Sequence, residues 1–223
     1  MIRKITLLAT FLILIASSDA FSQKFAQSVS IGIEGGVSVS NAHIWPNRPK
    51  ESFYKVGYIA GLLYDVNYSS KISFRTGVRY LTKGFRGNLP DTLGGFEYET
   101  TMYYLEAPLA VKYNLSTGTA KPYLLGGGYF GLNLSANGKF TSGNNTEEKN
   151  IDSTISIVDV GLLMGAGVDI RISKKTDLFI QAAYELGLNN IFLNRANDFF
   201  NADKYNSIKN YTFLLTGGIK FDL

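Results

Sequence analysis

Few side chains in this sequence have the types and spacing that catalysis needs. The chain's one histidine, His43, follows Ser38 and Ser40, and Glu34 precedes them. Serine, histidine and an acid are the parts of a nucleophilic triad, but no motif groups them here, so chance is the simpler interpretation. A single histidine and the absence of cysteine argue against a metal centre built from imidazoles or thiolates. We therefore expect no catalytic, cofactor or metal site.

Other potential binding features are equally weak. The glycine runs at 35–36 and 126–128 are followed by no helix pattern, so they do not resemble phosphate-binding loops. Glu147 and Glu148 lie in a polar stretch, 142–150, that we expect to be mobile. We interpret them as solvated charge, with weak divalent-cation binding as the alternative. The formal net charge of +4 is spread along the chain, which argues against nucleic-acid binding.

Many of the charged residues lie in segments where apolar and polar residues alternate with a period of two. Between Ile72 and Lys83, one face of an extended chain reads Ile, Phe, Thr, Val, Tyr, Thr, whereas the other face carries Arg75, Arg79 and Lys83. Successive side chains of a strand point to opposite faces. Three cations on one face and none on the other therefore indicate a strand with one apolar and one polar side.

Eight segments show this alternation, although a glycine run obscures it in the fifth. They are 29–40, 58–68, 72–83, 102–115, 123–135, 156–172, 178–189 and 211–222. Each is long enough for the ~9–11 residues of a tilted spanning strand, and the even number fits a bacterial barrel. The sequence therefore predicts an all-β fold, an eight-stranded antiparallel up-and-down transmembrane β-barrel. A soluble β-sandwich is the alternative, but its strands are usually shorter, and aromatics near the ends of the apolar faces favour membrane girdles.

The first residues form a different kind of segment. Arg3 and Lys4 precede an apolar run, 5–16, that is shorter than the ~20 residues a spanning helix needs. Small residues follow, and they fit cleavage after Ser22, with cleavage after Ala20 as the alternative. We expect a signal peptide at 1–22 and an outer-membrane β-barrel domain at 23–223. An uncleaved anchor helix is the other possibility.

The predicted connections alternate in length, which indicates the orientation of the barrel. The long ones are 41–56, 84–100, 141–154 and 193–209, and the short ones are 69–71, 116–119 and 173–176. Outer-membrane barrels have short periplasmic turns and longer extracellular loops. We therefore expect the cell outer membrane, with both termini periplasmic and the long loops, including His43, outside.

The polar strand faces would line the lumen of the barrel with acids and bases in nearly equal numbers. The set is Glu34, Asp65, Arg75, Arg79, Lys83, Glu106, Lys112, Asp159, Asp169, Arg171, Glu185, Lys220 and Asp222. Eight strands leave just enough room for side chains, and an unpaired buried charge is costly. We expect a paired network that closes the lumen, with Arg75 or Arg79 pairing with Glu106. Inward glycines would make room for the long cationic side chains. An ion or proton pathway is the alternative.

Three stretches resemble a known family, the PorT-type outer-membrane β-barrel proteins of Bacteroidetes. They are GYIAGLL at 57–63, RTGVRYLTKG at 75–84 and YLEAPLAVKY at 104–113. The resemblance covers most of the predicted mature chain and implies an outer-membrane barrel. The family's founding member is linked to type IX secretion and gliding, and most members have no assigned role. The chain ends Phe221-Asp222-Leu223, whereas such barrels often end in an aromatic residue.

These observations favour a structural or accessory barrel with a closed lumen. A link to protein secretion is implied by the resemblance alone. Its expected partners are outer-membrane lipid, the barrel-assembly machinery during insertion, and a protein bound at the loops or the periplasmic rim. A narrow porin that passes small solutes or ions is the main alternative. A soluble, lipocalin-like binder in the periplasm is the third.

Overall fold

The computed structural model describes residues 27–45, 52–88, 97–143, 145–192 and 207–223. The expected signal peptide at 1–22 lies outside these residues. Within them, no helix has the length and apolar character that crossing a bilayer requires.

The described chain is built from strands, and each predicted segment corresponds to one of them. The strands are β1 (Ser28–Trp45), β2 (Ser52–Asn67), β3 (Ile72–Asn88), β4 (Glu97–Asn114), β5 (Ala120–Ser142), β6 (Asn145–Asn150), β7 (Val158–Ser173), β8 (Thr176–Gly187) and β9 (Ser207–Asp222). Most are longer than the sequence predicts, because the extended conformation continues into the expected loops.

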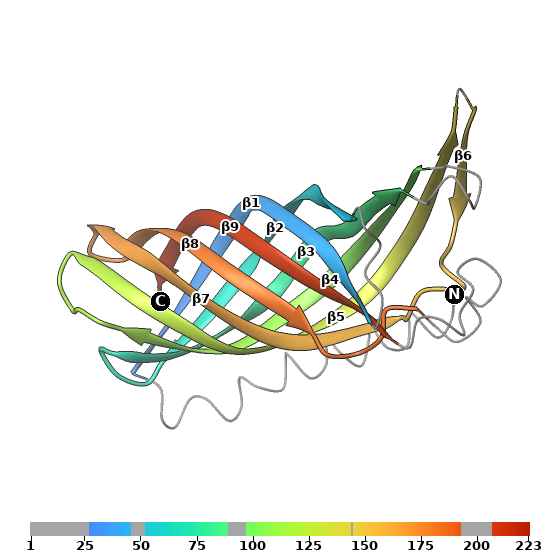
Figure 1. The fold of residues 1–223 in the computed structure, drawn as a ribbon. Coiled ribbons are helices and arrows are strands. Elements are labelled where there is room, and N and C mark those ends of the chain that lie inside the picture. The colour runs from blue at the N-terminus through green and yellow to red at the C-terminus, as the bar shows by residue number, and fades with distance from the viewer. Residues whose placement is uncertain (1–26, 46–51, 89–96, 144, 193–206) are drawn as a thin grey trace.

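The strands close into a ring, as Figure 1 shows. Neighbours in sequence pair antiparallel from β1 to β5, then β5 pairs with β7, β7 with β8, β8 with β9, and β9 with β1. Eight of the nine described strands therefore form an up-and-down barrel with no free edge. The predicted fold class is confirmed.

The ninth strand corrects the prediction for the 141–154 connection. Instead of a mobile loop, β6 pairs with the end of β5 from Asn137 to Ser142. Gly143 at the turn has φ of +57°, a left-handed conformation that glycine adopts without steric cost. The resulting hairpin projects beyond the barrel (Figure 1). The sequence did not predict this strand, because a two-stranded projection has no buried face and its side chains need not alternate between apolar and polar.

The prediction that His43 lies in a loop is also wrong. β1 continues to Trp45, and His43 stands opposite Lys209 of β9. Backbone pairing with the neighbouring strand extends β1 past the point where its hydrophobic alternation ends.

The barrel has two different ends. The short turns between β2 and β3, β4 and β5, and β7 and β8 lie at one end with Ser28 and Leu223; we call it the turn end. The opposite end, which carries the β5–β6 hairpin, is the loop end (Figure 1).

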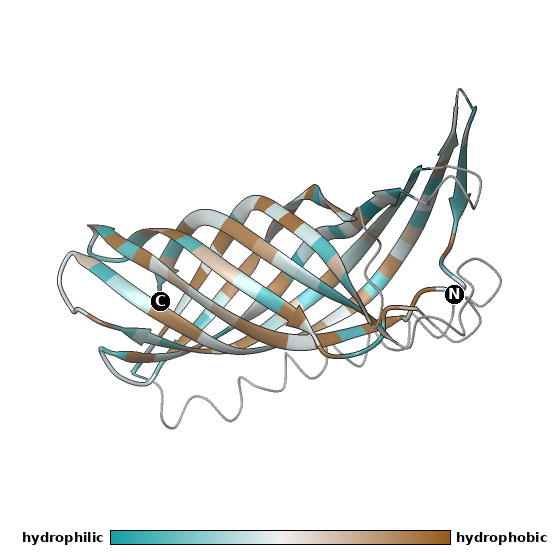
Figure 2. Cartoon of the chain, viewed as in Figure 1, coloured by the Kyte–Doolittle hydropathy of each residue, from teal (hydrophilic) through white to brown (hydrophobic). Residues whose placement is uncertain are grey.

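The outward face of the barrel is apolar and exposed, with aromatic residues near both ends. Figure 2 shows apolar and polar positions alternating along the strands. Towards the loop end, the rings of Tyr58, Tyr80 and Tyr103 follow one another across β2, β3 and β4 with centroid separations of 5.9 and 6.2 Å. Tyr68 and Tyr113 are exposed towards the turn end. Two aromatic belts around an apolar band fit the interfaces and core of a bilayer.

Glycines on the inward face make room for aromatic rings as well as for cations. A Cβ on Gly161 would lie 2.5 Å from the ring of Tyr129, and one on Gly61 would lie 2.6 Å from the Cβ of Arg79. Both distances are shorter than atoms tolerate. The small residues on the ring of strands therefore let large side chains fill the lumen.

Candidate functional site

The lumen contains two groups of buried ionisable side chains. We call Arg79, Lys83, Glu106, Asp159 and Glu185 the loop-side cluster, and Asp65, Arg75, Lys112, Asp169 and Lys220 the turn-side cluster. Every member of both clusters is buried. They come from β2, β3, β4, β7, β8 and β9, so each cluster connects strands on different sides of the barrel.

The loop-side cluster is a continuous network of ion pairs. Arg79 Nε donates to Glu106 Oε1 over 2.8 Å, and its Nη2 contacts both Glu106 and Glu185. Lys83 Nζ lies 2.8 Å from Glu106 Oε2, 3.0 Å from Glu185 Oε2 and 3.3 Å from Asp159 Oδ2. Two cations thus join three carboxylates contributed by three further strands.

Arg75 organises one half of the turn-side cluster. Its Nε and Nη2 each donate to one oxygen of Asp65 over 2.7 Å, the bidentate geometry that suits a guanidinium and a carboxylate. Its Nη1 donates to Gln181 Oε1 over 2.7 Å, and the Tyr123 hydroxyl lies 3.3 Å from the same nitrogen. Arg75 is therefore held from β2, β5 and β8 at once.

Two lysines complete the turn-side cluster. Lys220 Nζ lies 2.7 Å from Asp169 Oδ2 and 3.3 Å from Asp65 Oδ2. Lys112 pairs with the same oxygen of Asp169 and lies 3.7 Å from Asp65. The two aspartates are shared, so no single pair in this cluster is independent of the others.

Aromatic rings lie against cations in both clusters. Lys83 Nζ lies 4.1 Å from the ring centroid of Tyr129, and Lys112 Nζ lies 4.2 Å from that of Tyr123. Cation–π contacts of this kind stabilise an ammonium group that has lost its water. The rings also occupy space that a water column would need.

Strand register explains part of this pairing. Asp65 stands opposite Arg75, and Arg79 stands opposite Glu106. Arg79 therefore makes the pair with Glu106 that the strand order predicts, whereas Arg75 is drawn to Asp65. The contact from Arg79 to Glu185 crosses the lumen between strands that are not neighbours, so no local pattern in the sequence encodes it.

The remaining expected lumen residues lie outside the two clusters. Glu34 is buried between Gly61 and Gly218, and neither carboxylate oxygen has a hydrogen-bond partner among the residues that the structure describes. Arg171 lies at the turn end, where its Nη2 is 2.9 Å from Asp222 and 3.2 Å from Asp177. The structure thus gathers most of the predicted set, but leaves Glu34 apart.

Sequence reasoning missed several groups in the lumen. Asp177 is buried and pairs with Arg171 and Lys121. It lies one residue before the predicted strand 178–189, and extending the alternation of Phe179 and Gln181 backwards would have found it. Tyr123 and Tyr129 gave no signal, because a tyrosine on the inward face looks the same in sequence as one on the outward face.

An apolar cluster lies at the loop end of the barrel, and the sequence did not predict it. Segments 151–157 and 188–192 meet there: Ile155 bridges to Phe192, and Ser156 N donates to Ile191 O over 2.7 Å. Ile191 N in turn donates to Ile208 O of β9 over 2.8 Å. These connections therefore fold back against the barrel wall.

The side chains of these connections pack with residues on the inward face. Phe85 contacts Tyr98 and Phe192 edge to face, with centroid separations of 6.0 and 6.4 Å. We call the whole group the apolar cap: Phe85, Tyr98, Met102, Ala136, Ile151, Ile155, Ile191, Phe192 and Ile208. The cap joins the same apolar cluster as Leu81 and Leu214. It lies beside the loop-side cluster, because Met102 of the cap stands opposite Lys83 in the register of β3 and β4.

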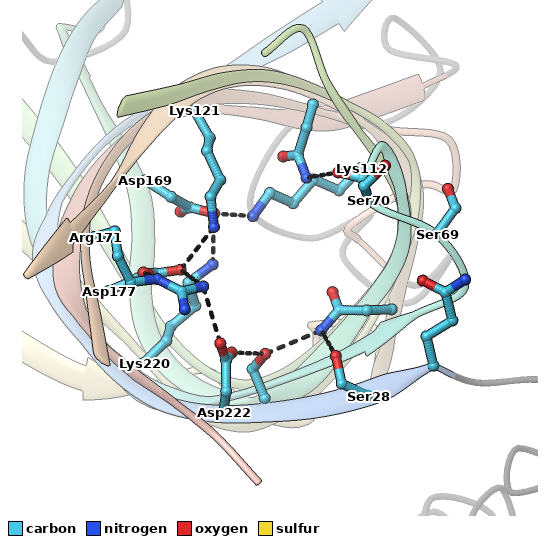
Figure 3. Close-up of a pocket in the computed structure, with 14 residues that line it drawn as sticks. Ser28, Ser69, Ser70, Lys112, Lys121, Asp169, Arg171, Asp177, Lys220 and Asp222 are labelled. Carbon is cyan, nitrogen blue, oxygen red and sulfur yellow. Dashed lines mark hydrogen bonds and ion pairs between the residues drawn. The ribbon is translucent and has the colours of Figure 1, made fainter. Parts of the chain in front are cut away.

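The turn end of the lumen is different, because it opens into a polar pocket of about 160 Å³. Figure 3 looks into this pocket through the ring of strands. Lys112, Asp169 and Lys220 of the turn-side cluster line it together with Arg171 and Asp222. Among the described residues, apolar side chains thus cluster at one end of the lumen, and a polar pocket opens at the other.

The serines considered for catalysis are engaged in structural contacts. Ser38 Oγ donates to the backbone oxygen of Thr82 over 2.6 Å, and Ser40 Oγ donates to that of Gly84 over 3.0 Å. Among the described residues, no three histidine, cysteine, aspartate or glutamate side chains form a group that could hold a metal ion. The chemistry supported by this arrangement is charge pairing and polar binding.

The match to a family model agrees with this architecture. The family model described as "Outer membrane protein beta-barrel domain" matches residues 21–193. Among solved structures, the chain is similar to the attachment invasion locus protein Ail of Yersinia pestis, with 16% identity over 86% of this chain and 98% of that one and a TM-score of 0.41. It is also similar to OprG of Pseudomonas aeruginosa, with 12% identity over 89% and 97% and a TM-score of 0.49. The outer membrane protease OmpT of Escherichia coli shares 10% identity over 89% and 97%, with a TM-score of 0.44.

No curated protein matches the chain. The family model, in contrast, covers well over half of it. The chain therefore belongs to the outer membrane protein β-barrel domain family.

Proposed function

We propose that this protein is a structural or accessory barrel of the outer membrane whose lumen is closed to solutes. The observation that carries the proposal is the loop-side cluster packed directly beside the apolar cap. In the proposed closed state, paired charges and apolar side chains together would fill the cross-section at the loop end. A solute crossing the membrane would have to displace both.

The energetics of the cluster support a permanently closed state. Removing one partner from a buried ion pair typically costs about 3–5 kcal/mol, because the other charge stays buried without compensation. Arg79 and Lys83 each contact more than one carboxylate, so opening a path between them breaks several contacts together. Such a network is better suited to holding the wall of a narrow barrel than to conducting.

The orientation in the membrane is part of the proposal. Outer-membrane barrels place short turns in the periplasm and longer connections outside. The turn end, with both ends of the described barrel, would then face the periplasm, and the β5–β6 hairpin would face the exterior. A signal peptide at 1–22, cleaved to leave a domain at 23–223, is the export route that we propose.

If the lumen is closed, the functional contacts would lie on surfaces outside the lumen. The projecting hairpin offers an exposed polar surface from Asn145 to Asn150 for a protein partner. The periplasmic rim is the second such surface, and the barrel-assembly machinery would act during insertion. The resemblance of three stretches to PorT-type barrels of Bacteroidetes favours a partner in type IX secretion.

A narrow porin is the second candidate, favoured by the polar pocket at the turn end. A conducting form would extend this pocket past Glu34 and through the loop-side cluster. It would require the apolar cap to move aside as well.

Permeability of proteoliposomes to a small sugar such as arabinose distinguishes the two candidates. We expect vesicles with the refolded barrel to swell no faster than empty vesicles. The matched positive control is a hollowed variant, Arg79→Ala with Glu106→Ala and Phe85→Ala, which should admit the sugar if it folds. Rapid swelling with the unmodified barrel would reject the closed lumen and favour the porin.

A further inference from the structure

The polar pocket at the turn end has the properties of a binding site for a small molecule. Its volume is about 160 Å³. For comparison, an apolar cavity of ~150 Å³ accommodates benzene, a molecule of six heavy atoms. None of the described residues that line the pocket is apolar, so an apolar ligand would find no surface to bury here. A ligand of this site is small and carries polar groups.

The pocket contains a cation with unused hydrogen-bonding capacity. Lys121 of β5 points into it (Figure 3). Its ion-pair partner among the described residues is Asp177, with 3.5 Å between Nζ and Oδ2, which is too long for a strong hydrogen bond. Asp177 is also held by Arg171. Within the described part of the chain, the Lys121 ammonium therefore keeps donors that a ligand can use.

The same pocket contains unused acceptors. Asp169 Oδ1 and Asn114 Oδ1 are buried and accept no hydrogen bond from the described residues. The other oxygen of Asp169 is the one that Lys112 and Lys220 share. Buried polar atoms are satisfied in the great majority of proteins, so two free acceptors in one pocket indicate a partner that donates.

The residue with the unused donor lies next to one of the residues with an unused acceptor, and the second acceptor lines the same pocket. Lys121 stands directly opposite Asp169 in the register of β5 and β7. We propose that this pocket binds a small zwitterion: its carboxylate accepts from Lys121, and its ammonium donates to Asp169 Oδ1 and Asn114 Oδ1. Free amino acids with short side chains are the chemical class that fits the volume.

Ligands with one charge fit the pocket less well. An anion alone would leave the free oxygens of Asp169 and Asn114 without donors. A ligand that is only a cation would lie near the ammonium groups of Lys112, Lys121 and Lys220. Such a ligand carries no anionic group that could accept hydrogen bonds from them. The zwitterion matches both sets, and its net charge of zero leaves the charge balance of the turn-side cluster unchanged.

Binding can be measured on the refolded barrel in detergent micelles by nuclear magnetic resonance. Glycine is the zwitterionic probe, acetate is the anion alone, and methylammonium is the cation alone. We expect glycine to cause saturable shifts of backbone amides around Lys121 and Asp169. Acetate and methylammonium should bind at least about tenfold more weakly, because each forfeits one charge-assisted contact.

Matched variants locate the site. Lys121→Met keeps the length of the side chain but removes its charge, and should weaken glycine binding about tenfold. Lys71→Met makes the same change on an exposed residue of the β2–β3 turn that does not line the pocket, and should leave binding unchanged. Asn114→Ala provides a second variant, with a smaller expected loss, in case Lys121→Met does not fold.

Three results would overturn the proposal. If free glycine causes no saturable shifts of the backbone amides, the pocket holds water alone. Acetate that binds as tightly as glycine would make it a simple anion site. Equal glycine affinity in Lys121→Met and Lys71→Met would place the binding elsewhere on the barrel.

Discussion

Arg79 offers the sharpest test of the loop-side cluster, because it holds two carboxylates at once. Arg79→Met keeps most of the apolar stem but removes the charge that contacts Glu106 and Glu185. In formal charges, the loop-side cluster changes from two cations and three acids to one cation and three acids. The loss of a buried partner predicts a decrease of about 3–5 kcal/mol in the free energy of unfolding. Urea unfolding in lipid vesicles, followed by far-ultraviolet circular dichroism, measures this decrease.

A matched control and a double-mutant cycle separate pairing from general damage. Arg86→Met makes the same change on the same strand at an exposed arginine, and should cost less than about 1 kcal/mol. Combining Arg79→Met with Glu106→Gln should cost less than the sum of the single changes, by up to about 3 kcal/mol. Equal losses for Arg79→Met and Arg86→Met, or strict additivity with Glu106→Gln, would refute a coupled network.

Other predictions concern packing and orientation. Gly161→Ala should destabilise the barrel by about 1–3 kcal/mol in the same unfolding assay, because its Cβ would overlap the ring of Tyr129; a neutral effect would contradict this packing. Phe85→Ala should cost about 3–5 kcal/mol by opening a cavity in the apolar cap, and a loss below 1 kcal/mol would mean that the cap is loosely packed. The chain has no cysteine, so Glu147→Cys and Lys71→Cys give single labelling sites. A membrane-impermeant thiol reagent should label the first on intact cells and the second after permeabilisation, and the reverse pattern would invert the proposed orientation.

The barrel itself could be predicted from the sequence because its two sides meet different surroundings. Lipid outside and side chains inside impose alternation on every spanning strand, as between Ile72 and Lys83. The pair of Arg79 with Glu106 followed from the order of two neighbouring strands. These features depend on contacts between adjacent strands, which local sequence reports well.

Features that depend on distant contacts could not be predicted in the same way. The cap forms because 151–157 and 188–192 meet each other and β9, and neither segment shows a periodic pattern of its own. The contact of Arg79 with Glu185 depends on the width of the closed barrel. The β5–β6 hairpin forms where no buried face exists to mark it. In each case the feature depends on how the folded barrel arranges segments in space, which the local sequence does not indicate.

The central claim, a lumen closed at the loop end, is tested most directly by the conductance of single barrels in a planar bilayer. With the purified, refolded protein, we expect insertion without conductance steps, because the proposed closure by the loop-side cluster and the apolar cap would leave no continuous water path. Stable steps of reproducible size would contradict it, and would make Arg79, Lys83 and Glu106 the residues of a selectivity constriction.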